Sequence, residues 1–157
     1  MAIRFATVDD IPALVESGKT MHALTRFKVF DYDAARVADT LQKLIEKGQG
    51  KYVFMVAVDT QKHLVGALIA VLETHIFSNK LTASVMHYDV LPDKRMGGHG
   101  VRLLKAFETW CQNRQVFEIN LGINSLNAAQ AEQDTVGRFI QKMGYDKVGE
   151  NFVKGGL

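Results

Sequence analysis

The chain has 157 residues, a hydrophobic content of 47%, a charged content of 23% and a formal net charge of +2 at pH 7. This length and composition are typical of one globular domain over residues 1–157 that builds its core without disulfides. A net charge this small gives no basic surface for nucleic acid, so we expect no nucleic-acid partner. The single cysteine, Cys111, excludes an intrachain disulfide and a multi-cysteine zinc site.

One cysteine also fits a reducing compartment, and we expect the protein to be cytoplasmic. No basic segment followed by a long apolar one opens the sequence, so no secretory signal is predicted. The longest apolar stretch, residues 64–72, is about half as long as a membrane-spanning helix requires. The histidines lack metal-ligand spacing. We therefore expect neither a membrane nor a metal as a partner.

Residue periodicity predicts ten elements along the chain. Asp9, Asp10 and Pro12 are typical of a helix start, and Gly48 and Gly50 of a helix end. Apolar spacing and β-branched or aromatic runs predict, in chain order, strand 3–7, helix 11–21, helix 34–45, strands 52–59, 64–77 and 81–91, helix 101–111, strand 116–123, helix 136–143 and strand 145–153. The order β-α-α-β-β-β-α-β-α-β predicts an α/β (α+β) fold, a mixed sheet covered by helices on both faces. The unit over 81–123 should be parallel.

A glycine-rich bend joins the strand at 81–91 to the next helix. Three glycines within four positions, Gly97, Gly98 and Gly100, let backbone amides turn towards a ligand without obstruction by side chains. The helix that follows adds unpaired N–H groups and the positive end of its dipole. This combination predicts an anion site, most often for phosphate. The alternative is a tight turn, which needs only one such glycine.

The same bend resembles the phosphate-binding motif of the GNAT N-acetyltransferases. That motif is Arg or Gln, two residues, Gly, one residue, then Gly or Ala, and the chain matches it at Arg95, Gly98 and Gly100. Val90 and Pro92 stand where the family usually has a valine and a proline, and residues 139–145 resemble its aromatic ending. The resemblance implies a GNAT-type mixed sheet of six to seven strands flanked by about four helices.

The resemblance also implies acetyl-coenzyme A (acetyl-CoA) as the co-substrate. Backbone at Tyr88, Asp89 and Val90 would pair with its pantetheine arm like an added strand. The resemblance further implies that the bend and the helix start bind the pyrophosphate of acetyl-CoA. These residues are Arg95, Met96, Gly97, Gly98, His99, Gly100 and Val101. The asparagine that commonly opens the family's fourth helix corresponds to Asn124 or Asn127.

Direct transfer of an acetyl group to an amine requires a base. His87 and Asp89 share one face of their strand, and His87 ranks first because an ordinary histidine pKa of about 6.5 leaves it mostly neutral at pH 7. Glu118 on the next strand is a further candidate, and a purely structural role for each is open. The family's acid, a tyrosine four residues before a closing glycine, is replaced by Ile140.

We expect acetyl transfer from acetyl-CoA to a primary amine of a small molecule. The acceptor site is expected from residues 22–32 and 73–77, with a mobile surface segment as the alternative. Four further alternatives stay open: a coenzyme-binding module without catalysis, a protein or peptide N-acetyltransferase, transfer of a longer acyl group, and an interaction protein without a ligand. A homodimer is among the partners that the resemblance allows.

Overall fold

The computed structural model describes residues 2–48, 50–122 and 130–155, with only the backbone for 130–134. Its longer elements are the strands β1 (Ala2–Phe5), β2 (Tyr52–Val58), β3 (Leu64–Thr74), β4 (Leu81–Val90) and β5 (Glu118–Leu121), and the helices α1 (Ile11–Leu24), α2 (Ala34–Lys47), α3 (His99–Asn113) and α4 (Gln130–Lys142). Three short 3₁₀ turns also occur, η1 (Val8–Asp10), η2 (Arg26–Val29) and η3 (Pro92–Gly97).

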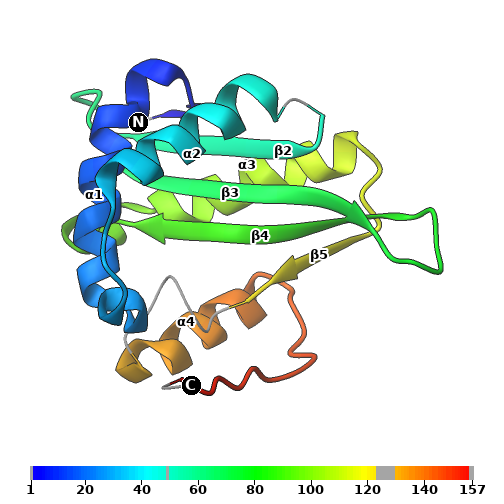
Figure 1. Ribbon diagram of the computed structural model, residues 1–157. Helices are drawn as coiled ribbons and strands as arrows, with labels where there is room; N and C mark the ends of the chain where they lie inside the picture. The colour runs from blue at the N-terminus through cyan, green and yellow to red at the C-terminus, as the bar shows by residue number, and fades with distance from the viewer. Residues whose placement is uncertain (1, 49, 123–129, 156–157) are drawn as a thin grey trace.

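The strands form one mixed sheet in the order β1-β2-β3-β4-β5 (Figure 1). The first three neighbouring pairs are antiparallel. For β2 and β3 the short connection between residues 52–59 and 64–77 predicts this arrangement. β4 and β5 are parallel, because α3 carries the chain from one end of β4 back to the start of β5. The predicted strand-helix-strand unit is therefore confirmed.

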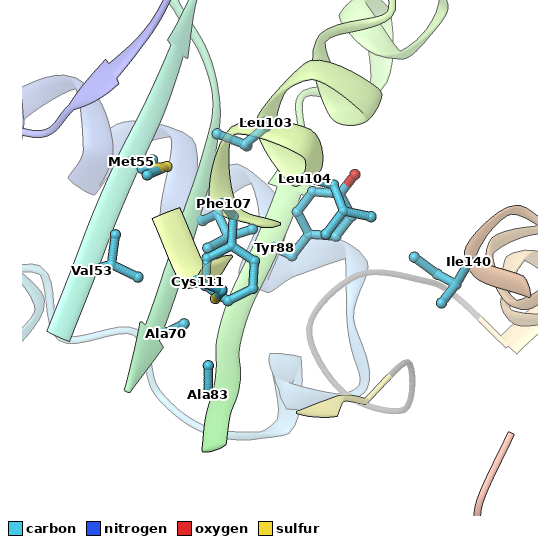
Figure 2. Packing of buried hydrophobic residues seen from close by; sticks show 11 residues of the cluster. Val53, Met55, Ala70, Ala83, Tyr88, Leu103, Leu104, Phe107, Cys111 and Ile140 are labelled. Atoms are coloured by element: carbon cyan, nitrogen blue, oxygen red, sulfur yellow. The ribbon is translucent and has the colours of Figure 1, made fainter. Parts of the chain in front are cut away.

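Helices cover both faces of the sheet. Figure 1 shows α1 and α2 on one face and α3 on the other. Under α1 and α2 a small cluster of apolar residues packs, which comprises Leu14, Phe54, Val56, Ala67 and Ile69. The larger core lies under α3 and reaches α4 (Figure 2), and it comprises Val53, Met55, Leu68, Ala70, Ala83, Tyr88, Leu103, Leu104, Phe107, Cys111 and Ile140. This two-sided burial explains why β2 and β3 are apolar on both faces.

Acidic residues stand at the starts of the first two helices, and the side chain of Asp33 caps α2. Asp33 accepts a hydrogen bond from the amide of Arg36 at 3.0 Å, so α2 starts directly after it. Before α1, the Asp10 carboxylate accepts from the amide of Thr7 at 2.8 Å and pairs with Arg4 at 2.8 Å. This ion pair lowers the pKa of Asp10, first through the hydrogen bonds from Arg4, and fastens β1 to the start of α1.

The prediction of a strand over residues 145–153 is wrong. Residues 145–155 form neither helix nor strand, and the described residues give a sheet of five strands rather than six to seven. The segment contains β-branched and aromatic residues, which strands favour, but Val148, Phe152 and Val153 remain exposed. Such residues stabilise a strand only where a neighbouring strand and a buried face accompany them.

The end of the chain differs from the prediction in a second respect, since α4 begins at Gln130 rather than near residue 136. In the part of the chain that the structure describes, no helix combines the length and the apolar character needed to cross a membrane.

Candidate functional site

β4 and β5 run side by side for only part of their length. Their ladder joins Thr82–Val85 of β4 to β5, from the pair Thr82 and Glu118 to the pair Val85 and Leu121. β4 continues to Val90, and among the described residues no β5 partner accompanies it beyond Val85. The carbonyl of Val90 accepts a hydrogen bond from Nε of Arg95 at 3.3 Å. Where the edge has no partner strand among the described residues, an extended ligand can add itself to the sheet as a strand does.

A β-bulge lies at the point where the two strands part. Val85 pairs with Ala70 of β3 and His87 pairs with Ile69, so Met86 is the extra residue. Simple alternation would place Val85 and His87 on one face of the sheet. The bulge moves His87 to the opposite face, under which α1 and α2 pack, and returns Tyr88 to the face covered by α3.

His87 and Asp89 form a pair on the face that they share. The distance from Nε2 of His87 to Oδ2 of Asp89 is 2.9 Å, and the two side chains are 24% and 10% exposed. Burial alone would lower the pKa of His87, but the charge of Asp89 and the hydrogen bond to it more than compensate and raise that pKa above its ordinary value. The structure thus brings together the two residues predicted to act in catalysis.

The glycine-rich bend forms η3 and the start of α3. Gly98 has a φ of 73°, a left-handed conformation that glycine adopts without strain. Arg102 donates from its backbone to the carbonyl of Gly98 at 3.2 Å and so begins the helical ladder. The amides of His99, Gly100 and Val101 therefore have no acceptor within the helix. Together with the helix dipole they can bind an anion.

The three glycines of the bend have different surroundings. A Cβ at Gly98 would meet no atom of the described residues within 4 Å, so it would stand in open space at the residue that precedes α3. A Cβ at Gly100 would lie 3.1 Å from Oη of Tyr88, and one at Gly97 would lie 2.8 Å from ring atoms of His99. Close packing against Tyr88 therefore favours glycine at position 100 whether or not phosphate binds beside it.

The remaining side chains of the predicted coenzyme site differ in their surroundings. Arg95 donates from Nε to the carbonyl of Val90 at 3.3 Å, and Met96 is fully exposed. His99 is buried, and its Nδ1 makes no hydrogen bond within the described part of the chain. Val101 is half-buried. Asn127 lies outside the described residues.

Two tyrosine contacts near this site were not predicted. Oη of Tyr88 donates to the carbonyl of Gly100 at 2.6 Å, and Oη of Tyr145 donates to Oε1 of Glu108 on α3 at 2.9 Å. Burial, then the charge of Glu108, raises the pKa of Tyr88, and burial and the bond to Glu108 raise that of Tyr145. Both hydroxyls are protonated at neutral pH. No sequence pattern indicates these two hydrogen bonds, because each tyrosine and its partner lie on different elements.

The connection between α1 and α2, expected to take part in the acceptor site, includes the short turn η2. Tyr32 donates from Oη to the carbonyl of Val15 at 2.7 Å, and the ring of His22 lies 5.2 Å from the ring of Tyr32. The guanidinium of Arg26 stacks on Phe27 at 4.4 Å. The contacts of Tyr32 with Val15 and His22 join the segment to α1.

The second expected acceptor segment is at the end of β3. Glu73 accepts a hydrogen bond from Oγ of Ser84 at 3.0 Å. Thr82 pairs with Glu73 on one side and with Glu118 on the other, so both carboxylates lie on the sheet face that carries His87 and Asp89.

The sequence has no match among family models or curated proteins. Solved structures do match over nearly the whole chain. A probable acetyltransferase superposes with a TM-score of 0.78 at 12% identity, covering 100% of this chain and 99% of that one. An aminoglycoside acetyltransferase from an uncultured soil metagenomic sample, crystallised with sisomicin, gives a TM-score of 0.71 at 18% identity, covering 99% and 96%. A Trypanosoma brucei acetyltransferase gives 0.70 at 14%, covering 99% of both chains.

These structures are similar to the chain in fold. The chain thus shares its mixed α/β fold with these structures, in agreement with the fold class expected from the sequence. Identities this low show the arrangement of the elements and leave the reaction to be argued from the site itself.

Proposed function

We propose that the chain is an acetyl-CoA-dependent N-acetyltransferase that moves the acetyl group directly to a primary amine of a small molecule. The observation that carries the proposal is the edge of β4 beyond Val85, which has no partner strand among the described residues, together with the amides at the start of α3 that have no acceptor within the helix. Acetyl-CoA has the complementary shape, since an arm with amide groups is joined to a pyrophosphate. The edge fits the arm and the helix start fits the phosphates.

The residues at the site fit this ligand on structural grounds. A Cβ at Gly98 would stand in space that no atom of the described residues fills, at the residue that precedes the unpaired amides of α3. A phosphate oxygen can therefore approach those amides. The pantetheine arm would be held by backbone at Tyr88 to Val90, and the pyrophosphate by amides between Met96 and Val101.

Acetyl-CoA supplies a thioester carbonyl that a neutral amine can attack. The amine begins as an ammonium with a pKa near ~10.4, so a base must remove a proton. The bond to Asp89 keeps the proton of neutral His87 on Nε2, which leaves Nδ1 to accept one. Because Asp89 raises the pKa of His87, the neutral form is reached at a higher pH than for an ordinary histidine.

The acceptor is a cationic small molecule in this proposal. Asp89, Glu73 and Glu118 lie on the sheet face that carries the proposed base, and their negative charge favours an ammonium over an anionic compound. The similarity to an aminoglycoside acetyltransferase solved with sisomicin supports an acceptor that carries several amines.

The proposal is tested by the release of free coenzyme A thiol from acetyl-CoA over a panel of polyamines, aminoglycosides, amino acids and peptides. We expect calorimetric binding of acetyl-CoA, thiol release that requires an amine, and an acetylated product by mass spectrometry. If thiol is released only with peptides, the acceptor is a protein or peptide rather than a small molecule. A chain that does not bind acetyl-CoA contradicts the proposal.

A coenzyme-binding module without catalysis is the second candidate. The observation that favours it is Ile140, which stands where the resemblance places the catalytic tyrosine and is only 4% exposed in the core. A thiolate is a good leaving group, so transfer does not depend on that acid. Tight binding of acetyl-CoA with no thiol release across the panel would support the binding module over the enzyme.

A further inference from the structure

We propose that Tyr88 is a positioning residue that holds the start of α3 at a fixed place relative to the open edge of β4, and so aligns the two halves of the coenzyme site. The proposal rests on the proposed function, because it assigns the alignment to acetyl-CoA. Tyr88 would act through its side chain on the helix, while its backbone lies on the strand edge.

The side chain of Tyr88 crosses from β4 to α3. The bulge at Met86 places Tyr88 on the face covered by α3, and its ring packs in the core beside Leu104 (Figure 2). The ring is 7% exposed, and Oη reaches the carbonyl of Gly100 at 2.6 Å. A short hydrogen bond in a buried setting restrains the two elements more firmly than the same bond in water.

Gly100 is the matching half of this contact. A Cβ at this position would lie 3.1 Å from Oη of Tyr88 and 3.6 Å from Cγ2 of Val90. The first turn of α3 therefore rests on two alternate residues of β4, both in the segment beyond the β5 ladder. The glycine permits this approach, and the hydroxyl fixes it.

The contact joins the two surfaces that acetyl-CoA would bind at once. When the halves of a ligand bind to correctly spaced sites, the second half binds as if at high effective concentration. If the sites shift relative to each other, each half still binds alone, but the gain from linking them falls. Removal of the Tyr88 hydroxyl should therefore weaken intact coenzyme A more than either half.

The test compares wild type with Tyr88→Phe by calorimetry, using coenzyme A, its nucleotide half 3′-phosphoadenosine 5′-diphosphate, and pantetheine. We expect the affinity for coenzyme A to fall about fivefold, the effect of one hydrogen bond, while the affinities for the halves stay within about twofold. Tyr32→Phe is the matched control, since it removes a similar bond to a backbone carbonyl, 2.7 Å long, on α1. It should leave the affinity for coenzyme A unchanged.

Hydrogen exchange gives a readout without a ligand. In Tyr88→Phe, amides in the first turns of α3 should exchange faster while those of β2 and β3 do not. If Tyr88→Phe fails to fold, Gly100→Ala takes its place, because alanine favours a helix and its Cβ pushes against Oη. The same pattern of affinities is expected from it.

The outcomes separate this role from the proposed function. A wild-type chain that does not bind coenzyme A overturns the proposed function, and the role of Tyr88 with it. If wild type binds, equal losses for coenzyme A and its nucleotide half, or no loss for coenzyme A, overturn the role of Tyr88 alone.

Discussion

Nε2 of His87 donates to Oδ2 of Asp89 at 2.9 Å, and both side chains lie on the face of β4 that α3 does not cover. Two residues apart on a regular strand, they were expected to share a face. The carboxylate keeps the imidazolium favourable in a setting whose burial alone would disfavour it. Replacing the carboxylate therefore changes the pH at which His87 can act as a base.

Asp89→Asn should shift the acidic limb of the pH profile of transfer to lower pH. Without the charge of Asp89, burial remains as the main influence and lowers the pKa of His87, so the neutral base appears earlier as pH rises. The measurement is kcat as a function of pH at saturating substrates.

The control for Asp89→Asn is Asp59→Asn, which removes a carboxylate 3.7 Å from the exposed His63 and should leave the profile in place. If the acidic limb of the pH profile moves to higher pH in Asp89→Asn, or does not move, the group that titrates in that limb is not His87.

The pair also makes stability depend on pH. His87 has a raised pKa in the folded chain, so its contribution is fully present below its ordinary pKa of about 6.5 and is lost as pH rises through the folded value. The difference in unfolding free energy between wild type and His87→Gln should therefore be larger at acidic than at alkaline pH. Urea unfolding of both proteins measures it, and a difference that widens with pH would contradict the pairing.

Much of the fold could be predicted because periodicity is local. The apolar spacing of α1, α2 and α3 and the β-branched runs of β2, β3 and β4 all matched their elements. The failed strand at 145–153 shows the limit, since Val148 and Phe152 are residue types that strands favour but have no buried face. Whether such a segment forms a strand depends on a neighbour elsewhere in the chain.

Only the part of the candidate site that is contiguous in the sequence could be predicted. The bend from Arg95 to Gly100 is contiguous, so its motif is visible in the sequence. The bulge at Met86 is a mismatch between two strands, and no residue type marks it. The bond from Tyr88 to Gly100 depends on that bulge, because the bulge decides which face Tyr88 occupies.

Gly98→Glu should abolish measurable binding of acetyl-CoA. The added side chain would project into the open space ahead of α3 and bring a negative charge to the amides that would hold phosphate. It also strains the backbone, because the φ of 73° is unfavourable for glutamate. Calorimetry measures the affinity, and circular dichroism checks the fold.

Gly50→Glu separates charge at the bend from backbone strain. Gly50 has a φ of 85° and open space around a Cβ, but it lies in the turn before β2. This variant should carry a comparable strain of about 1 kcal/mol and still bind acetyl-CoA. Equal binding by Gly98→Glu and Gly50→Glu would remove the phosphate assignment.

Phe107→Ala should lower the free energy of unfolding by about 3–5 kcal/mol, because it leaves a cavity in the core between α3 and the sheet. The side chain of Phe107 is fully buried. Phe77→Ala, at a position that is 83% exposed between β3 and β4, should change the stability by less than about 0.5 kcal/mol. Urea unfolding of both variants gives the comparison, and a small loss for Phe107→Ala would place the core elsewhere.

Cys111 separates direct transfer from a route through an acetylated enzyme. Its thiol is 2% exposed, and burial, then the charge of Glu108, raises its pKa to about 12. Because the thiolate is the nucleophilic form, this thiol should resist Ellman's reagent at pH 8 in the native chain and react once the chain is unfolded in urea. Cys111→Ala should keep its kcat and lose about 1 kcal/mol of stability through the small cavity that it leaves. A variant that folds and binds acetyl-CoA but no longer transfers acetyl would contradict direct transfer and favour a route in which Cys111 first takes the acetyl group from acetyl-CoA and releases the coenzyme A thiol.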